Sequence, residues 1–233
     1  MSPLFNVQQK RCKGFRQLAL KHLEDEQTFG ALRELHFERP SFYVAEVRLI
    51  DLSPISALPH LESLVLDIFT FIDDNDVARI IAACERLKHL SLRVPRSSHH
   101  AMVTGASLGK LHQCLPLLEA LLLQNVRAED GTVESFAALQ HLRSLSLEDV
   151  NISPSALRPL FHNARFAKCS LRQCFNLSRR LLSSRVEEMI AIVRQDDTAA
   201  RRVVSVAQES AFDPPKFVNV PRNMTLKLTK MRY

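Results

Sequence analysis

The stretch LPHLESLVL, residues 58–66, returns as LPLLEALLL at residues 115–123 and as LQHLRSLSL at residues 139–147. All three contain a leucine, two variable residues, a leucine, one variable residue and a leucine. The sequence holds six copies of this unit, which begin at Leu32, Leu61, Leu87, Leu118, Leu142 and Phe166. A unit that recurs along a chain is the mark of a repeat architecture. We therefore expect a stack of six similar units.

The spacing inside each unit predicts a short strand. Side chains alternate along a strand, so the fourth and sixth positions should point inward, while the first position packs where the chain enters the strand. Successive copies begin 29, 26, 31, 24 and 24 residues apart, and the longest interval implies an insertion. Val47, Ile50 and Leu52 also fit the unit, but only 14 residues before the next copy, and we interpret them as a truncated turn or a chance match.

Between the strands the apolar residues change to helical spacing. Residues 76–86 follow the capping stretch Asp73–Asn75 and place four apolar side chains on one helix face: Val77, Ile80, Ile81 and Cys84. A second helix is predicted over residues 153–163, with Ser153 as the cap and Pro154 in the first turn. Strand, loop and helix in repetition predict an α/β solenoid of about six irregular repeats. Its parallel sheet should be concave, with the helices on the convex side.

These units resemble the leucine-rich-repeat superfamily, and within it the irregular repeats of F-box and ribonuclease-inhibitor-like proteins. The resemblance covers residues 32 to about 174, and CERLKHLSL at residues 84–92 is similar to the subclass with a cysteine before the first leucine. The family's ninth position is usually Asn or Cys, whereas here it is Pro40, Phe69, Pro95, Val126, Val150 and Cys174. The resemblance implies a protein-binding scaffold, and an F-box relative would recruit substrates as a ubiquitin ligase adaptor. The Leu-Pro start of an F-box is not found, so we expect a box to be lost, degenerate or outside this chain.

Four segments are expected along the chain. Residues 1–31 are predicted to form an N-terminal capping helix, with a mitochondrial presequence as the alternative because residues 1–23 contain five Lys or Arg and no acid. Residues 32–174 form the repeats, and residues 175–210 are predicted to be a C-terminal helical cap, based on Val186, Met189, Ile190 and Val193 at helical spacing. Residues 211–233 are predicted to be a basic tail or an edge strand.

Charge and cysteine content restrict the compartment and the partners. The net charge of +6 comes from the ends, since residues 24–164 contain twelve bases and nineteen acids. The basic ends leave RNA as a weaker candidate partner than protein. Five cysteines are an odd number in a chain of this size, which favours a reducing, intracellular compartment, cytoplasmic or nuclear, or mitochondrial if the presequence alternative holds. Apolar runs are far shorter than the roughly 20 residues of a membrane span.

The sequence offers no convincing catalytic, cofactor or metal site. His99 and His100 lie together in a polar insertion without Cys, Asp or Glu at ligand spacing. Asp73, Asp74 and Asp76 resemble a fragment of a calcium loop, but the downstream Gly and Glu are missing, and helix capping explains them better. The five glycines form no phosphate-binding pattern. We expect no enzymatic activity, no cofactor, no metal and no small-molecule substrate.

The third, fifth, seventh and eighth positions of each unit are predicted to project from the concave face. Val65 and Leu122 supply an apolar centre, and charged residues surround it, as at an interface with a core and a rim. From these positions we select ten candidate partner-binding residues: His36, Val65, Asp67, His89, Arg93, Leu122, Gln124, Asn125, Glu148 and Arg172. The alternatives are that two exposed aliphatic residues are ordinary, and that the chain is a structural or assembly subunit of a larger organellar or ribonucleoprotein complex.

Overall fold

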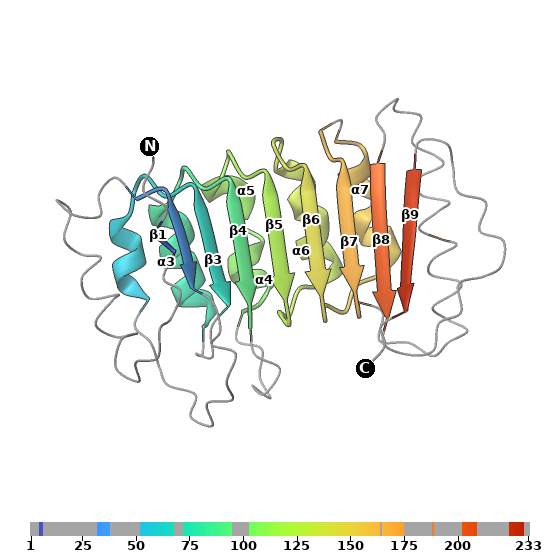
Figure 1. Cartoon of the computed structure of the whole chain (residues 1–233), viewed down its shortest axis with the longest axis horizontal. Coiled ribbons are helices and arrows are strands. Elements are labelled where there is room, and N and C mark those ends of the chain that lie inside the picture. Colours follow the sequence, from blue (N-terminus) through green and yellow to red (C-terminus); the bar gives the residue numbers. More distant parts are fainter. Residues whose placement is uncertain are drawn as a thin grey trace, which may run out of the picture.

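A computed structural model describes residues 5–6, 32–37, 52–67, 72–94, 103–163, 165–174, 188, 202–208 and 224–230. In these residues one open sheet of nine strands follows the chain order from β1 to β9, and every neighbouring pair is parallel (Figure 1). The strands are β1 (Phe5–Asn6), β2 (Glu34–Phe37), β3 (Ser63–Asp67), β4 (His89–Arg93), β5 (Ala120–Gln124), β6 (Ser144–Glu148), β7 (Lys168–Arg172), β8 (Arg202–Gln208) and β9 (Met224–Lys230). The predicted α/β class with a parallel sheet is confirmed.

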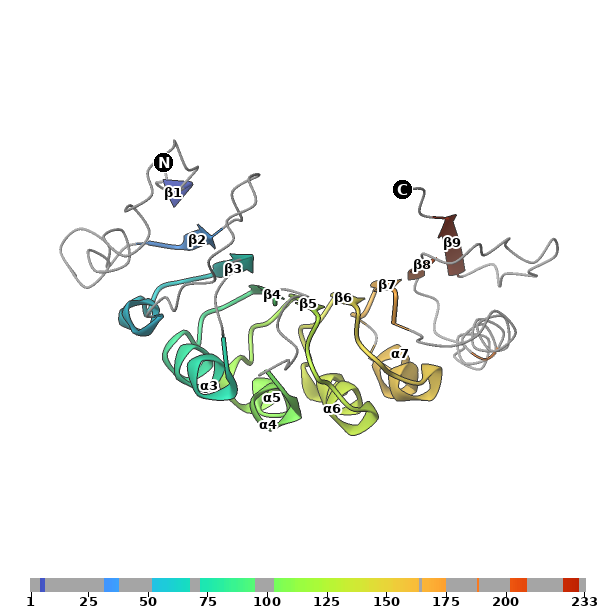
Figure 2. The ribbon, with the colours of Figure 1, turned by 90° about the horizontal axis from the view of Figure 1, so that it is seen from below.

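The helices lie along one face of this sheet. They are the 3-10 helix η2 (Ser53–Ala57), α3 (Asp74–Ala83), α4 (Gly105–Leu108), α5 (Leu111–Cys114), α6 (Asp130–Ser135), η3 (Phe136–Ala138), η4 (Pro154–Leu157) and α7 (Arg158–Phe161). Figure 2 shows the strands following an arc with the helices on its outer side. No helix in the described part of the chain is long and apolar enough to cross a membrane.

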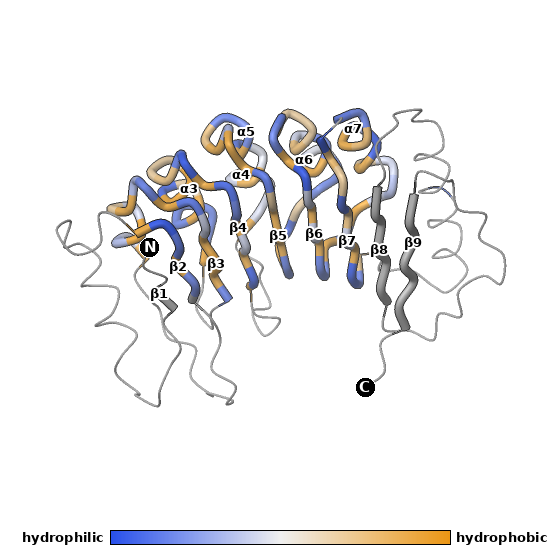
Figure 3. The backbone as a smooth tube through the Cα atoms, turned by 45° about the horizontal axis from the view of Figure 1, so that its top comes forward, coloured by the Kyte–Doolittle hydropathy of each residue, from blue (hydrophilic) through white to orange (hydrophobic). Residues whose placement is uncertain are grey.

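The core lies between the sheet and the helices. The strand register aligns Leu64, Leu90, Leu121 and Leu145 across β3 to β6, as the repeat predicts, and all four are buried. The first and sixth positions of the units are buried as well wherever their side chains are described. Each of β3, β5 and β6 therefore turns alternate residues into the core, and Figure 3 shows the hydrophobic residues along these strands.

The two predicted helices differ in how they begin. Asp73 caps α3 as expected: it accepts a hydrogen bond from the backbone N of Asp76, whose side chain accepts one from the Asp73 backbone N. Residues 153–163 do not form one α-helix but split into η4 and α7. The Ser153 hydroxyl makes no capping bond to its own helix and donates instead to Asp130.

The ends of the sheet depart from the expected segments. Strand β8 lies inside the stretch 175–210 for which we predicted a C-terminal helical cap, and its run of valines fits a strand better than a helix. Strand β9 covers the stretch in which an edge strand was one of the two predictions. Strand β1 pairs with β2 at the edge where a helical cap was predicted. The helices predicted around residues 8–24 and 186–193 lie outside the described residues, apart from Glu188.

Candidate functional site

The inner face of the arc is formed by the third, fifth and seventh positions of β2 to β7, which we call the concave face. Because the fourth and sixth positions point into the core, these residues point the opposite way, and the strand register arranges them in three rows across the sheet. The third-position row is Glu34, Ser63, His89, Ala120, Ser144 and Lys168. The fifth-position row is His36, Val65, Ser91, Leu122, Ser146 and Ser170. The seventh-position row is Asp67, Arg93, Gln124, Glu148 and Arg172.

Two ion pairs order the seventh-position row. Arg93 Nη1 lies 3.2 Å from Asp67 Oδ2, and Arg172 Nη1 lies 3.7 Å from Glu148 Oε1. In both pairs the guanidinium is the more exposed partner: the side chains are 40% exposed for Arg93 against 15% for Asp67, and 51% for Arg172 against 23% for Glu148. A partner approaching this row would therefore meet the cations before the carboxylates.

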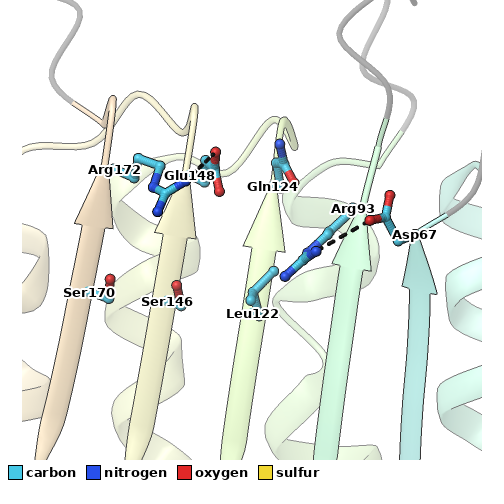
Figure 4. Close-up of a pocket in the computed structure, with 8 residues that line it drawn as sticks. All are labelled: Asp67, Arg93, Leu122, Gln124, Ser146, Glu148, Ser170 and Arg172. Carbon is cyan, nitrogen blue, oxygen red and sulfur yellow. Dashed lines mark hydrogen bonds and ion pairs between the residues drawn. The ribbon is translucent and has the colours of Figure 1, made fainter. Parts of the chain in front are cut away.

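A polar hollow of about 370 Å³ opens at the carboxyl ends of the strands (Figure 4). In this view Arg172 points toward Glu148, and the Arg93 guanidinium lies between Asp67 and Leu122. The lining residues are Asp67, Arg93, Leu122, Gln124, Ser146, Glu148, Ser170 and Arg172. The side-chain amide of Gln124 makes no hydrogen bond to any residue that the structure describes, so both of its polar groups are open to a partner.

A second hollow, of about 280 Å³, lies farther toward the amino ends of the strands and has an apolar floor. Val65, Ala120 and Leu122 line it together with His89 and Lys168. It shares Leu122, Ser146 and Ser170 with the polar hollow, so the two adjoin along the middle of the concave face. The concave face thus combines an apolar depression with a polar one.

Eight of the ten predicted residues line these hollows. Six of them border the polar hollow: Asp67, Arg93, Leu122, Gln124, Glu148 and Arg172. Val65 and His89 border the apolar hollow beside Leu122. His36 lies in the fifth-position row on β2 but borders neither hollow, and Asn125 lies beyond the end of β5.

The prediction that the eighth positions project from the concave face is wrong for Val94, and Arg39 and Ile68 lie outside the described residues. Val94 is buried, and Asn125, Asp149 and Gln173 all have φ of 55°, in the left-handed region. The Asn125 backbone N donates to the Glu148 carbonyl at 2.8 Å, and the Asp149 backbone N donates to the Arg172 carbonyl at 2.9 Å. These residues turn the chain out of each strand, a role that suits Asn and Asp because they tolerate positive φ.

The described residues at the ninth position of the units, Val126, Val150 and Cys174, are buried. At Cys174 the thiol donates to the Leu147 carbonyl at 3.1 Å. Two repeats earlier in the sheet, the Asn125 side chain donates to the Val94 carbonyl at 3.4 Å. Asn125 and Cys174 thus each donate to a main-chain carbonyl of the preceding repeat unit.

The selection of ten residues omitted serines that both hollows share. Ser146 stands at the fifth position beside Leu122 and Ser170 at the fifth position beside Ser146, and the hydroxyls of both serines make no hydrogen bond to any described residue. Lys168 and Ser144 line the apolar hollow at third positions. The repeat register places all four of these residues on the concave face. Nothing else in the sequence distinguishes them as partner-binding residues, because serines and single lysines are common on any surface.

Buried thiols in the core have a packing role. Burial raises the pKa of Cys84 to about 11 and that of Cys174 to about 12, and it also raises the pKa of Cys169. Protonated thiols are poor nucleophiles and poor metal ligands. Among the described residues, no three His, Cys, Asp or Glu side chains gather in a way that could hold a metal ion.

No protein-family model matches the sequence, and no curated protein is significantly similar to it. The concave face and its two hollows are therefore the features from which a function can be inferred.

Proposed function

We propose that this chain is a leucine-rich-repeat solenoid that binds another protein along its concave face. The observation that carries the proposal is the difference between the two faces of the sheet. Helices cover the outer face from β3 to β7, whereas the inner face is formed by strand residues that no described helix covers (Figure 2). Leu122 on β5, the middle strand of the sheet, and Val65 on β3 are only partly buried there.

The repeat assignment is supported by the coincidence of motif and strand. Each of the six sequence units falls on one of the six consecutive strands β2 to β7, and equivalent positions pair with one another. Fourth positions pair with fourth positions throughout, including Cys169, which replaces leucine on β7. A stack of such units, in which each contacts its neighbours, is the arrangement that repeat proteins use to build an extended binding surface.

Protein binding is supported by the chemistry of the concave face. Its centre offers aliphatic side chains and small serines, and its seventh-position row offers half-exposed guanidiniums. Arginine and apolar residues near the centre of an interface commonly contribute most of the binding energy. Recruitment of a ubiquitylation substrate, as by F-box relatives, is the more specific form of this proposal, and a Skp-type adaptor in the purified complex would support it.

The test is a quantitative affinity purification of the tagged full chain from its native source, with two matched leucine variants. Leu122→Ser removes the aliphatic side chain at the centre of the concave face. Leu117→Ser removes a 41% exposed leucine from the turn before β5, outside the concave face. We expect a specific partner to be lost with Leu122→Ser and retained with Leu117→Ser. Equal retention with both variants, or loss with Leu117→Ser alone, would contradict binding by the concave face.

A further inference from the structure

Strand β7 presents a cation, a hydroxyl and a second cation on the concave face. Lys168 is exposed, and its side chain makes no ion pair or hydrogen bond to a described residue. The Ser170 hydroxyl is also without a hydrogen bond in the described part of the chain. Arg172 is half-exposed, and its contact with Glu148, at 3.7 Å, is an ion pair beyond hydrogen-bonding distance. The most exposed charges on this strand are therefore positive.

Among the described residues, the opposite end of the concave face has one more acid than base, although the Arg93 guanidinium is more exposed than the Asp67 carboxylate with which it pairs. Glu34 on β2 and Asp67 on β3 are both acidic, and Arg93 on β4 is the base that pairs with Asp67. Between the two ends the third- and fifth-position rows hold no Asp, Glu, Lys or Arg; their residues are Ser63, Val65, His89, Ser91, Ala120, Leu122, Ser144 and Ser146. From Glu34 to Lys168 there are five strand spacings, which amount to about 24 Å at roughly 4.8 Å each.

We propose that the concave face selects an acidic segment of its partner over β7, with the segment continuing across an aliphatic contact at Leu122 toward β3. This deepens the proposed function and rests on it. Carboxylates placed over Ser170 could accept from its hydroxyl and from the flanking Lys168 and Arg172, and such charge-assisted hydrogen bonds are the stronger kind. A basic segment at the same place would be repelled by the exposed Lys168 and Arg172. The Glu148 carboxylate would attract it little, because Glu148 already forms an ion pair with Arg172.

A polypeptide fits this charge pattern better than a nucleic acid does. A polyanion that lay across the face would bring phosphates over Glu34 and Asp67 as well as over β7. It would also cover Val65 and Leu122 without offering an aliphatic group. A polypeptide can change its charge along its length and so match both ends. An acidic peptide is therefore the occupant to test, and RNA is the competing outcome.

The experiment measures fluorescence anisotropy of short labelled peptides with the full chain. The parent peptide carries a run of lysines, a leucine centre and a run of glutamates; in two others the glutamates are replaced by glutamines or by lysines. The test variant combines Lys168→Glu with Arg172→Glu. The control combines Lys110→Glu with Arg158→Glu, two exposed bases in the outer, helical layer that change the net charge equally.

We expect the glutamate peptide to bind most tightly and to lose about tenfold in affinity with the β7 variant, because two exposed attractions become repulsions. The control should change affinity less than about twofold, and the β7 loss should fade as salt rises. The lysine peptide should gain affinity for the β7 variant. A neutral version, Lys168→Gln with Arg172→Gln, should give an intermediate loss, and unchanged thermal midpoints confirm folding.

Three outcomes would overturn the proposal. They are equal affinity for the three peptides, a preference for the lysine peptide, and tighter binding of an oligouridine RNA than of the glutamate peptide. If the peptides bind equally but all lose affinity with Leu122→Ser, the concave face still binds polypeptide and only the charge selection is wrong. Absence of peptide binding rejects the acidic segment, while the capture of the native partner tests the proposed function separately.

Discussion

Asp74, the first residue of α3, accepts two hydrogen bonds from Thr104, the N-cap residue of α4. The backbone N of Thr104 lies 2.8 Å from Asp74 Oδ1, and the Thr104 hydroxyl lies 2.6 Å from Oδ2. Asp130, the first residue of α6, accepts the same two bonds from Ser153, the N-cap residue of η4, at 2.8 Å and 2.6 Å. The same arrangement thus occurs twice on the outer side of the sheet: a carboxylate at the start of one helix accepts two hydrogen bonds from the N-cap residue of a helix in the next repeat.

Asp74→Ala should lower the free energy of unfolding by about 1–2 kcal/mol, because it leaves a backbone N and two hydroxyls without their charged acceptor. Ser107 donates the third bond to the same carboxylate. Urea denaturation followed by circular dichroism measures the change. Glu134→Ala, which removes an exposed carboxylate from α6, is the matched control and should shift the free energy by less than about 0.5 kcal/mol. Equal effects of the two variants would show that the bonds do not stabilise the fold.

The same carboxylate predicts a pH dependence. Burial raises the pKa of Asp74, but the hydrogen bonds from Ser107 and Thr104 outweigh burial and hold the pKa below its ordinary value. A pKa that is lower in the folded than in the unfolded state stabilises the fold above the unfolded pKa of about 3.9, and the contribution is lost as the pH falls through the folded pKa. Asp74→Asn should therefore flatten the loss of stability below about pH 4. A parallel acid profile for the parent and Asp74→Asn would exclude this contribution.

Leu121 and Leu122 are adjacent, but they should respond oppositely to truncation. Leu121 points into the core and is buried, so Leu121→Ala should cost about 2–5 kcal/mol, and Leu121→Asp should unfold the neighbouring repeats. Leu122 points to the concave face, and Leu122→Ala should change stability by about 0.5 kcal/mol or less. Urea midpoints distinguish the two. A large loss with Leu122→Ala would mean that this side chain packs in the core, against the strand register.

The core residues can be predicted from the sequence, because the buried positions recur at regular spacing, both along each strand and from one repeat to the next. Leu64 and Leu121 lie 57 residues apart yet occupy equivalent places, and the alternation along each strand also identifies the concave residues between them. The left-handed turns after β5 and β6 had a readable signal too, since Asn125 and Asp149 share the eighth position. These features were predictable in principle from local spacing alone.

Other features depend on contacts that no local pattern encodes. Asp74 and Thr104 are 30 residues apart and share no motif, so their pairing appears only in the folded chain. Strand β8 lacks the leucine spacing of the repeats, and the helical spacing just before it led to the wrong expectation. Ser146 and Ser170 stood at predicted concave positions, but their place in both hollows depends on the curvature of the sheet.

The buried thiols should be protected from alkylation in the native state. Burial raises the pKa of Cys84 to about 11 and that of Cys174 to about 12, so little thiolate is present near neutral pH, and both sulfurs are covered. Cys114 is only partly buried. With iodoacetamide at pH 8, mass spectrometry should find Cys114 modified well before Cys84 and Cys174, and urea should abolish the difference. Early modification of Cys174 in the native chain would contradict its burial.

Arg93 should matter for the partner and hardly at all for folding. Its ion pair with Asp67 is half-exposed, and such pairs contribute about 0–1 kcal/mol, so Arg93→Ala should move the free energy of unfolding by about 0.5 kcal/mol. A partner seated in the polar hollow would lose the guanidinium, and arginines near an interface centre commonly contribute about 1–2 kcal/mol or more. Arg93→Lys should recover little of this loss, because an ammonium cannot reproduce the planar fork of the guanidinium. Binding of the captured partner by calorimetry, with urea denaturation of the same samples, measures both quantities.

The matched control for Arg93→Ala is Lys110→Ala, which removes an exposed base beside α5 in the outer, helical layer. It should leave both stability and partner affinity unchanged, because Lys110 lies away from the concave strands. If Lys110→Ala instead weakens the partner while Arg93→Ala does not, the contact surface lies on the helices. The concave face would then not be the binding surface. The chain would be better described as a structural subunit that packs into a larger assembly through its helical side.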